Sequence, residues 1–388
     1  MSRQSDRLII TGGKLILERG IVADKDLIIE NRFMKEVADR GKVSTGAVLD
    51  AHGNYVAPGF IDIHTHGSFG VDVVSATREE IAHLQKRLPE SGVTGFLATV
   101  AGTTRDEVDR AVHKLQNART ESVSGAQILG VHLEGPHLNP ARCGAIPAEL
   151  LESFDASQCD LLESVESPAT MTFAPELEGS VSLIDELNRR GIVPCGGHSE
   201  ATFEQTVTAA SRGMRHITHL FNTMSTPHHR APNIVTAGLV LDELTVELIA
   251  DGQHLAPSVV ALAYKAKGID RIILVTDATA AAGMPDGEYT LGKRTVFVRN
   301  GIARTSEGAL AGSTLTLNAA LKNFREFTGA DLCGAIKTVT SNPARLLGID
   351  DRKGKIEPNM HGDITIFDEN LDIIATVIAG KCVWGALS

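Results

Sequence analysis

Six ionisable side chains stand at or near the ends of short apolar runs, where together they could bind a divalent metal ion. His64 and His66 end one run and are two residues apart, so both can point to the same side of a strand. Four later runs end near one ionisable residue each: Glu134, His198, His219 and Asp277. Imidazoles and carboxylates are typical ligands of zinc-like ions. A His-x-His pair alone is common by chance, but the six together predict a site for one or two metal ions that still leaves a free carboxylate.

These side chains follow apolar runs that alternate with helical stretches such as REEIAHLQKRLPESG and SVSLIDELNRRG. The runs cover residues 59–67, 92–102, 128–136, 170–179, 191–199, 215–222, 245–254 and 271–279. Eight strand–helix units close a parallel barrel, and active sites on that barrel lie at the C-terminal ends of its strands. The pattern therefore predicts an α/β protein, a TIM-like (β/α)8 barrel with all six side chains on one rim.

Both ends of the chain have the alternating apolar and polar pattern of short strands. It runs through residues 7–17, 26–37 and 47–59, and returns in residues 363–385. Neither end has enough apolar residues for a core of its own. We therefore expect a small β-sandwich domain built from both termini, residues 1–56 plus 353–388, beside a barrel domain of residues 57–352.

Charge and composition argue against several classes of protein. The chain has 37 Lys and Arg against 48 Asp and Glu, and a net charge of −11 disfavours binding to nucleic acid or anionic membranes. No apolar run approaches the ~20 residues of a membrane helix, and the N-terminus lacks the apolar core of a signal peptide. The five Cys are scattered without a CxxC pair. We expect a soluble, cytoplasmic protein with neither nucleic acid nor membrane as a partner.

Several long motifs resemble the amidohydrolase superfamily and, within it, the N-acetylglucosamine-6-phosphate deacetylase family. They are APGFIDIHTHG, GVHLEGPHLNPARCGA, GGHSEA, ITHLFNTMSTPHHRAP, ADGQH, LVTDATAAAGMPDG and LAGSTLTL, in the family order from about residue 57 to 317. The flanking β segments also fit the split small domain of the family. The resemblance implies hydrolysis of the acetamido group of N-acetylglucosamine 6-phosphate.

The resemblance also implies ligands for one or two divalent ions, with zinc or iron expected. Glu134, His198 and His219 would bind the principal ion. His64 and His66 would bind a second ion, with Glu134 bridging the two. Asp277 would transfer protons between water and the leaving amine. The branch of the superfamily with a carboxylated Lys on strand four is disfavoured, because TMTFAPELEG has no Lys.

Substrate contacts are expected at the matching motif positions: Asn222, Thr223, Arg230, His254, His137 and Leu310. Arg230 and His254 would bind the phosphate, and in an expected homodimer Arg230 could reach the site of the neighbouring subunit. The chain departs from the family at Ile146, where a His or another polar residue usually reaches the acetyl carbonyl. His137, earlier in the same loop, is the expected substitute.

Three alternatives remain open. The first is the same reaction on N-acetylgalactosamine 6-phosphate, which differs only at the 4-hydroxyl. The second is a cyclic-amide hydrolase on the same barrel, which the Arg230–His254 pair and the missing Lys disfavour. The third is a barrel without catalytic activity, which is disfavoured because no residue of the expected metal set is missing.

Overall fold

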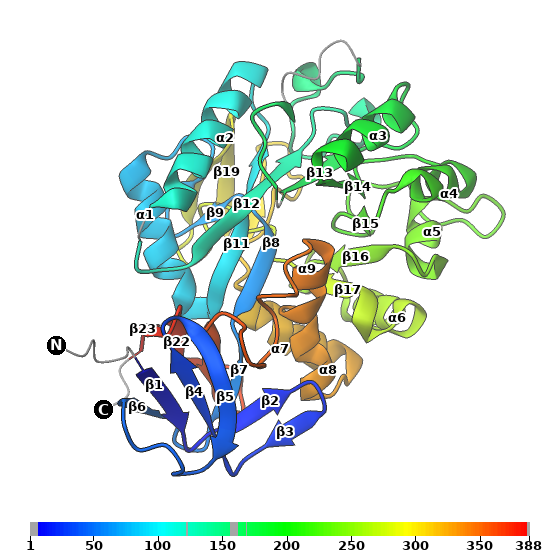
Figure 1. The fold of residues 1–388 in the computed structure, drawn as a ribbon. Helices are drawn as coiled ribbons and strands as arrows, with labels where there is room; N and C mark the ends of the chain where they lie inside the picture. Colours follow the sequence, from blue (N-terminus) through cyan, green and yellow to red (C-terminus); the bar gives the residue numbers. More distant parts are fainter. Residues whose placement is uncertain (1–6, 122, 156–161, 168, 386–388) are drawn as a thin grey trace.

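A (β/α)8 barrel forms the body of the protein in the computed structural model, which describes residues 7–121, 123–155, 162–167 and 169–385 (Figure 1). Its parallel strands are β8 (Phe60–Thr65), β11 (Val93–Ala101), β12 (Gln127–Glu134), β13 (Ala169–Phe173), β14 (Ile192–Gly196), β15 (His216–Ile217), β16 (Thr245–Leu248) and β17 (Ile272–Leu274). They pair in chain order, and a parallel bridge from Thr65 to Ala278 brings the first strand to the segment after the last. The predicted barrel is confirmed: six strands lie inside the predicted runs, and β12 and β13 each begin one residue before theirs.

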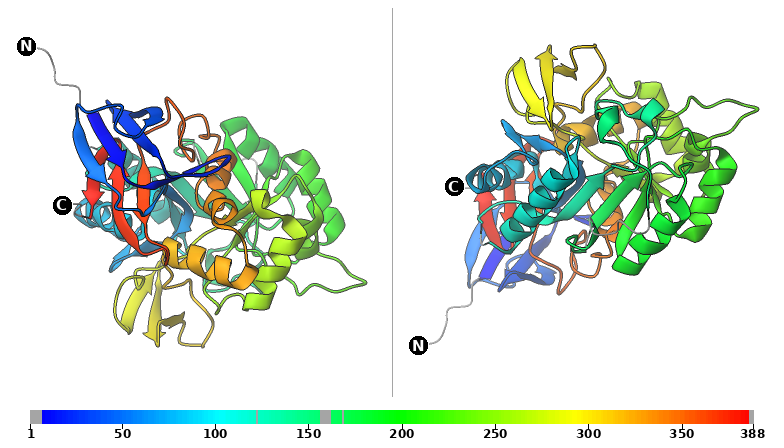
Figure 2. Two further views of the ribbon diagram at one scale, coloured as in Figure 1. Left: turned by 90° about the horizontal axis from the view of Figure 1, so that it is seen from below. Right: turned by 90° about the horizontal axis from the view of Figure 1, so that it is seen from above.

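Helices lie on the outside of these strands, as the view from above in Figure 2 shows. They are α1 (Arg78–Arg87), α2 (Arg105–Thr120), α3 (Ser180–Arg190), α4 (Phe203–Arg212), α5 (Ile234–Val240), α6 (Pro257–Lys267), α7 (Leu317–Thr328), α8 (Leu332–Lys337) and α9 (Ser341–Leu346). Capping boxes explain where some begin: the Thr77 hydroxyl accepts from the Glu80 backbone N–H, and the Glu80 carboxylate accepts from that of Thr77. The strands are buried on both faces, as in β11, where every residue is buried.

Two sheets built from both chain ends form the small β-sandwich. The first has the order β5 (Phe33–Asp39), β4 (Lys25–Glu30), β1 (Arg7–Thr11), β6 (Ala47–Asp50). The second has the order β23 (Lys381–Trp384), β22 (Ile373–Ile378), β21 (Ile364–Phe367), β7 (Tyr55–Pro58), β2 (Lys14–Leu17), β3 (Gly20–Val22). Their shared core packs Ile10 and Leu27 against Ile366 and Val377, which confirms that the two termini pair. Residues 1–6 and 386–388 of the expected domain lie outside the described residues.

An antiparallel sheet that the sequence patterns did not predict is inserted in the chain between β17 and α7. It consists of β18 (Gly287–Leu291), β19 (Arg294–Arg299) and β20 (Ile302–Arg304), drawn in yellow to one side of the barrel in Figure 2. Two strands of two residues, β9 (Gly67–Ser68) and β10 (Val71–Asp72), follow β8. Within the described part of the chain, no helix has the length and apolar character to cross a membrane.

Candidate active site

The predicted metal ligands converge at the C-terminal rim of the barrel, because parallel strands all end there. Glu134 is the last residue of β12, and His64 is the next to last of β8. The other four follow the strand ends within a few residues: His66, His198, His219 and Asp277. All six are buried.

The backbone turns sharply at three of these residues to aim their side chains inward. His198, His219 and Asp277 have φ of 47°, 27° and 48°, in the left-handed region that non-glycine residues rarely adopt. Each such conformation costs on the order of 1–3 kcal/mol and persists only where the surrounding structure imposes it, most often at functional sites.

Two imidazole nitrogens come together at one oxygen of Glu134. Its Oε1 lies 3.0 Å from the Nε2 atoms of both His198 and His219, and these two nitrogens are 3.1 Å apart. The His198 ring is oriented from its other side, since Nδ1 donates to the Arg142 carbonyl at 2.8 Å. Two imidazole nitrogens facing one carboxylate oxygen are a ligand set for a divalent ion.

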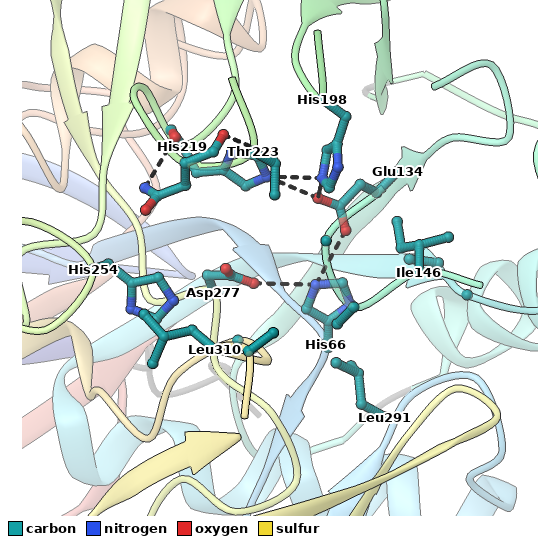
Figure 3. A pocket seen from close by; sticks show the side chains of 17 residues that line it. His66, Glu134, Ile146, His198, His219, Thr223, His254, Asp277, Leu291 and Leu310 are labelled. Atoms are coloured by element: carbon teal, nitrogen blue, oxygen red, sulfur yellow. Dashed lines mark hydrogen bonds and ion pairs between the residues drawn. The ribbon is translucent and has the colours of Figure 1, made fainter. Parts of the chain in front are cut away.

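A second set of donors shares the same carboxylate (Figure 3). The Nε2 atom of His66 lies 3.4 Å from Glu134 Oε2 and 3.2 Å from Asp277 Oδ1. The Nε2 atom of His64 lies 3.8 Å from Glu134 Oε1 and 3.5 Å from Asp277 Oδ1, and it is buried without a hydrogen-bond partner among the described residues. Buried polar atoms rarely stay unpaired, so this nitrogen fits a metal ligand. Glu134 is thus placed between two possible ions.

The imidazoles keep both carboxylates ionised. Burial alone would raise the pKa of Glu134, but hydrogen bonds from His198, His219 and His66 hold it well below its usual range. Burial also opposes ionisation of Asp277, whose pKa is nevertheless lowered by the charges of His64 and His66. Asp277 is therefore a proton acceptor at neutral pH, beside the second set of donors.

Sequence reasoning missed Glu247, which holds two of the predicted metal ligands in place by hydrogen bonds. This buried residue of β16 accepts from His64 Nδ1 at 2.9 Å, from His216 Nε2 at 3.0 Å and from the His219 backbone N–H at 3.0 Å. Burial opposes its ionisation, yet the charge of His64 and the hydrogen bond from His216 hold the pKa of Glu247 well below normal. The available signal was a lone acid inside the apolar run TVELIA, since buried acids are rare unless paired.

A cavity of about 300 Å³ opens above these donors. Four of the expected substrate contacts line it: Asn222, Thr223, His254 and Leu310. The His254 ring is held by Asp251, whose Oδ2 lies 2.7 Å from Nδ1. Burial opposes protonation of His254, but the hydrogen bond to Asp251 raises its pKa above that of an ordinary imidazole.

Two predicted substrate contacts are not among the described residues that line this cavity. Arg230 is exposed and donates to His229 Nε2 at 2.7 Å, in the outward-projecting loop between β15 and α5 (Figure 2). His137 is turned away, with its ring edge-to-face against Phe154 and its Nδ1 3.1 Å from the Glu152 carbonyl. In this geometry the His137 ring does not line the cavity, so the expectation that it replaces the usual polar group stays a prediction without support from its position.

Ile146 lines the cavity directly, so the chain presents an apolar side chain at this wall. It is 8% exposed and packs with Ala101 and Leu138. Leu291, from the unpredicted sheet, lines the same cavity. The wall that contains Ile146 is thus largely apolar, in contrast to the wall that contains Asn222 and His254.

Known proteins resemble this chain over nearly its whole length. Residues 55–383 match the model of the Amidohydrolase family. An N-acetylglucosamine-6-phosphate deacetylase of Bacillus subtilis is 34% identical, covering 93% of this chain and 96% of the relative. An N-acetylgalactosamine-6-phosphate deacetylase of Escherichia coli O157:H7 is 33% identical, covering 96% and 98%.

A solved structure shares the fold. It is an N-acetyl-D-glucosamine-6-phosphate deacetylase mutant of Mycobacterium smegmatis in complex with N-acetyl-D-glucosamine-6-phosphate, 30% identical with a TM-score of 0.89. The match covers 98% of this chain and 99% of that one. With the barrel, the rim of histidines and acids and the family match in agreement, this chain belongs to the amidohydrolase family.

Proposed function

We propose that the protein is a metal-dependent deacetylase that hydrolyses the acetamido group of N-acetylglucosamine 6-phosphate to glucosamine 6-phosphate and acetate. The observation that carries this proposal is Glu134 between two pairs of imidazoles, with the Asp277 carboxylate alongside, at the base of a cavity large enough for a small molecule. The names of the similar proteins support the choice of substrate.

The donor set fits one or two divalent ions. Glu134, His198 and His219 would hold the principal ion, and His64 and His66 with Glu134 the second. A bound ion would lower the pKa of water toward neutrality and polarise the acetamido carbonyl. Imidazole and carboxylate ligands suit both zinc and iron, and we propose one of these two metals.

Asp277 carries the proton in this reaction. Its ionised carboxylate accepts a proton from the water that attacks the acetamido carbonyl carbon. The same carboxyl group then donates that proton to the sugar nitrogen as the C–N bond breaks. The acetic acid formed passes its proton to the amine or the solvent, so the products leave as acetate and the amino sugar phosphate, and Asp277 is again ionised for the next cycle.

The polar wall of the cavity suits the sugar phosphate. Asn222 and Thr223 offer hydrogen bonds, Leu310 offers an apolar contact, and the His254 imidazolium offers a charged donor for the phosphate. Arg230 is too exposed to serve this cavity alone, so we propose a homodimer in which Arg230 of one subunit reaches the phosphate bound by its neighbour.

Domain limits and a cellular location complete the proposal. We propose domain limits of residues 1–56 plus 353–388 for the β-sandwich and residues 57–352 for the barrel, in keeping with the mixed core of both termini. We also propose a cytoplasmic location, since a phosphorylated sugar is charged and does not readily cross a bilayer.

Acetate release tests this proposal. The kcat/KM should be highest for N-acetylglucosamine 6-phosphate, lower for N-acetylgalactosamine 6-phosphate and lowest for plain N-acetylglucosamine. A higher value for the galactosamine substrate would transfer the assignment to the activity named for the E. coli relative. No acetate from any of the three would contradict the proposal and favour another amide substrate or an inactive barrel.

A further inference from the structure

A second cavity lies directly behind Ile146. Its volume is about 170 Å³, and it shares Ala101, Gly102, Glu134 and Ile146 with the cavity described above. The remaining lining comes from the end of β11, the loop that leads into α2, the first turn of α2 and the segment after β12. Ile146 and the short stretch Ala101–Gly102 therefore form a thin wall between two chambers that both reach Glu134.

The position of this wall relative to the polar groups determines which part of the substrate would face it. Figure 3 shows His254 and Ile146 on opposite sides of the Asp277 and Glu134 carboxylates. If the sugar phosphate lies against Asn222 and His254, the acetamido nitrogen of the substrate lies on the side of these two residues. The acetamido carbonyl carbon then lies over the metal ligands. The acyl chain continues from the carbonyl carbon away from the nitrogen, and so toward Ile146.

We propose that Ile146 limits the length of the N-acyl group, and that the chamber behind it is a subsite for acyl carbons beyond acetyl. This inference rests on the deacetylase function proposed above. An acetyl methyl ends at the Ile146 side chain, whereas a butyryl chain has two further carbons that need the space behind it. The chamber of about 170 Å³ has room for these two carbons, since a whole water molecule occupies only roughly 30 Å³ in the liquid. Pro136, Val108, Leu150 and Leu151 give its wall an apolar part.

The test compares N-acetyl-, N-propionyl- and N-butyrylglucosamine 6-phosphate as substrates. One methylene too many in a closed apolar pocket costs roughly 10–200-fold, so the wild-type kcat/KM should fall at least ~10-fold with each added carbon. Ile146→Ala removes the wall beyond Cβ, and it should raise the butyryl-to-acetyl ratio of kcat/KM by ~10-fold or more.

A second variant fills the chamber from its far side. Val108 lines only the second of these two cavities, so Val108→Phe alone should leave acetyl hydrolysis unchanged. Combined with Ile146→Ala, it should return the butyryl-to-acetyl ratio to the wild-type value. If Ile146→Ala is too unstable to assay, Ile146→Val with the propionyl substrate replaces it.

The outcomes separate this inference from the proposed function. Acetate release by the wild type, with unchanged acyl ratios in Ile146→Ala or Ile146→Val, would overturn the inference and leave the deacetylase function standing. Persistence of the butyryl gain in the Val108→Phe double variant would also overturn it, since the added carbons would then lie elsewhere. No acid released from any substrate by the wild type would overturn the proposed function itself.

Discussion

Replacing Glu247 with Gln should weaken the proposed metal binding at His64 and His66 more than the proposed metal binding at His198 and His219. Glu247 is ionised, so its carboxylate can only accept hydrogen bonds. Its Oε2 atom accepts one from the His219 backbone N–H and a second from His64 Nδ1 at 2.9 Å. Nδ1 of His64 therefore carries a proton, and in the neutral ring its Nε2 presents a lone pair toward Glu134 and Asp277. Loss of such a supporting carboxylate typically lowers metal affinity about 10–100-fold.

The difference between the two ions follows from what Glu247 touches. Its contact with His64 is to the ring, whereas its contact with His219 is to the backbone, which β15 and the following turn also hold in place. We therefore expect the full ~10–100-fold loss only at the His64–His66 site. Glu247→Ala should also destabilise the metal-free protein. It leaves three buried donors unpaired at ~1–3 kcal/mol each, a loss of at least ~3 kcal/mol.

Metal titration against a competing chelator, with elemental analysis, measures both affinities, and urea unfolding measures stability. Glu243→Gln, at an exposed Glu just before β16, is the matched control and should change neither. The account of Glu247 would be refuted if Glu247→Gln bound both ions with wild-type affinity, or if it weakened the His198–His219 ion first.

Three further predictions concern catalysis, substrate and stability. Asp277→Asn should keep its metal by elemental analysis but lower kcat by ~10²–10⁴-fold, because an amide cannot accept the proton; near wild-type turnover would assign the proton to another group. Arg230→Ala should raise KM for N-acetylglucosamine 6-phosphate by ~10-fold or more, while an equal loss of kcat/KM with the unphosphorylated sugar would remove Arg230 from phosphate binding. Burial, with the charge of Arg271, lowers the pKa of Lys267 from 10.5 to about 8, so the unfolded state binds more protons between these pH values. In urea unfolding, the wild type should gain stability relative to Lys267→Met from pH 8 to 10.5, and a constant difference would contradict this pKa.

The sequence located the rim of the site well because strand ends are visible in a pattern. A polar residue directly after an apolar run, such as Glu134 or Asp277, must lie at the edge of the sheet, and parallel strands bring such edges together. Direction of individual side chains in loops is not visible in this way. His137 and Arg230 belong to specific motifs, yet one packs against Phe154 and the other lies at the surface.

Contacts between strands that are far apart in the sequence could not be predicted from the pattern of apolar runs either. Glu247 looks like an isolated acid in β16, and only the fold shows that it joins His64, 183 residues away in the sequence, to His216 and the His219 backbone. The sheet β18–β20 escaped notice because its short, half-exposed strands lack a long apolar run. Leu291, which it contributes to the cavity, could not be foreseen without it.

Acetate release by metal-stripped protein tests the central claim most directly. The protein is treated with a chelator, freed of it, and given N-acetylglucosamine 6-phosphate with and without added zinc or ferrous iron. We predict no acetate without metal, and activity that returns and saturates at one or two equivalents of ion, in keeping with the two donor sets that share Glu134. Acetate release by the stripped protein at the rate of the untreated protein would contradict a metal-dependent deacetylase.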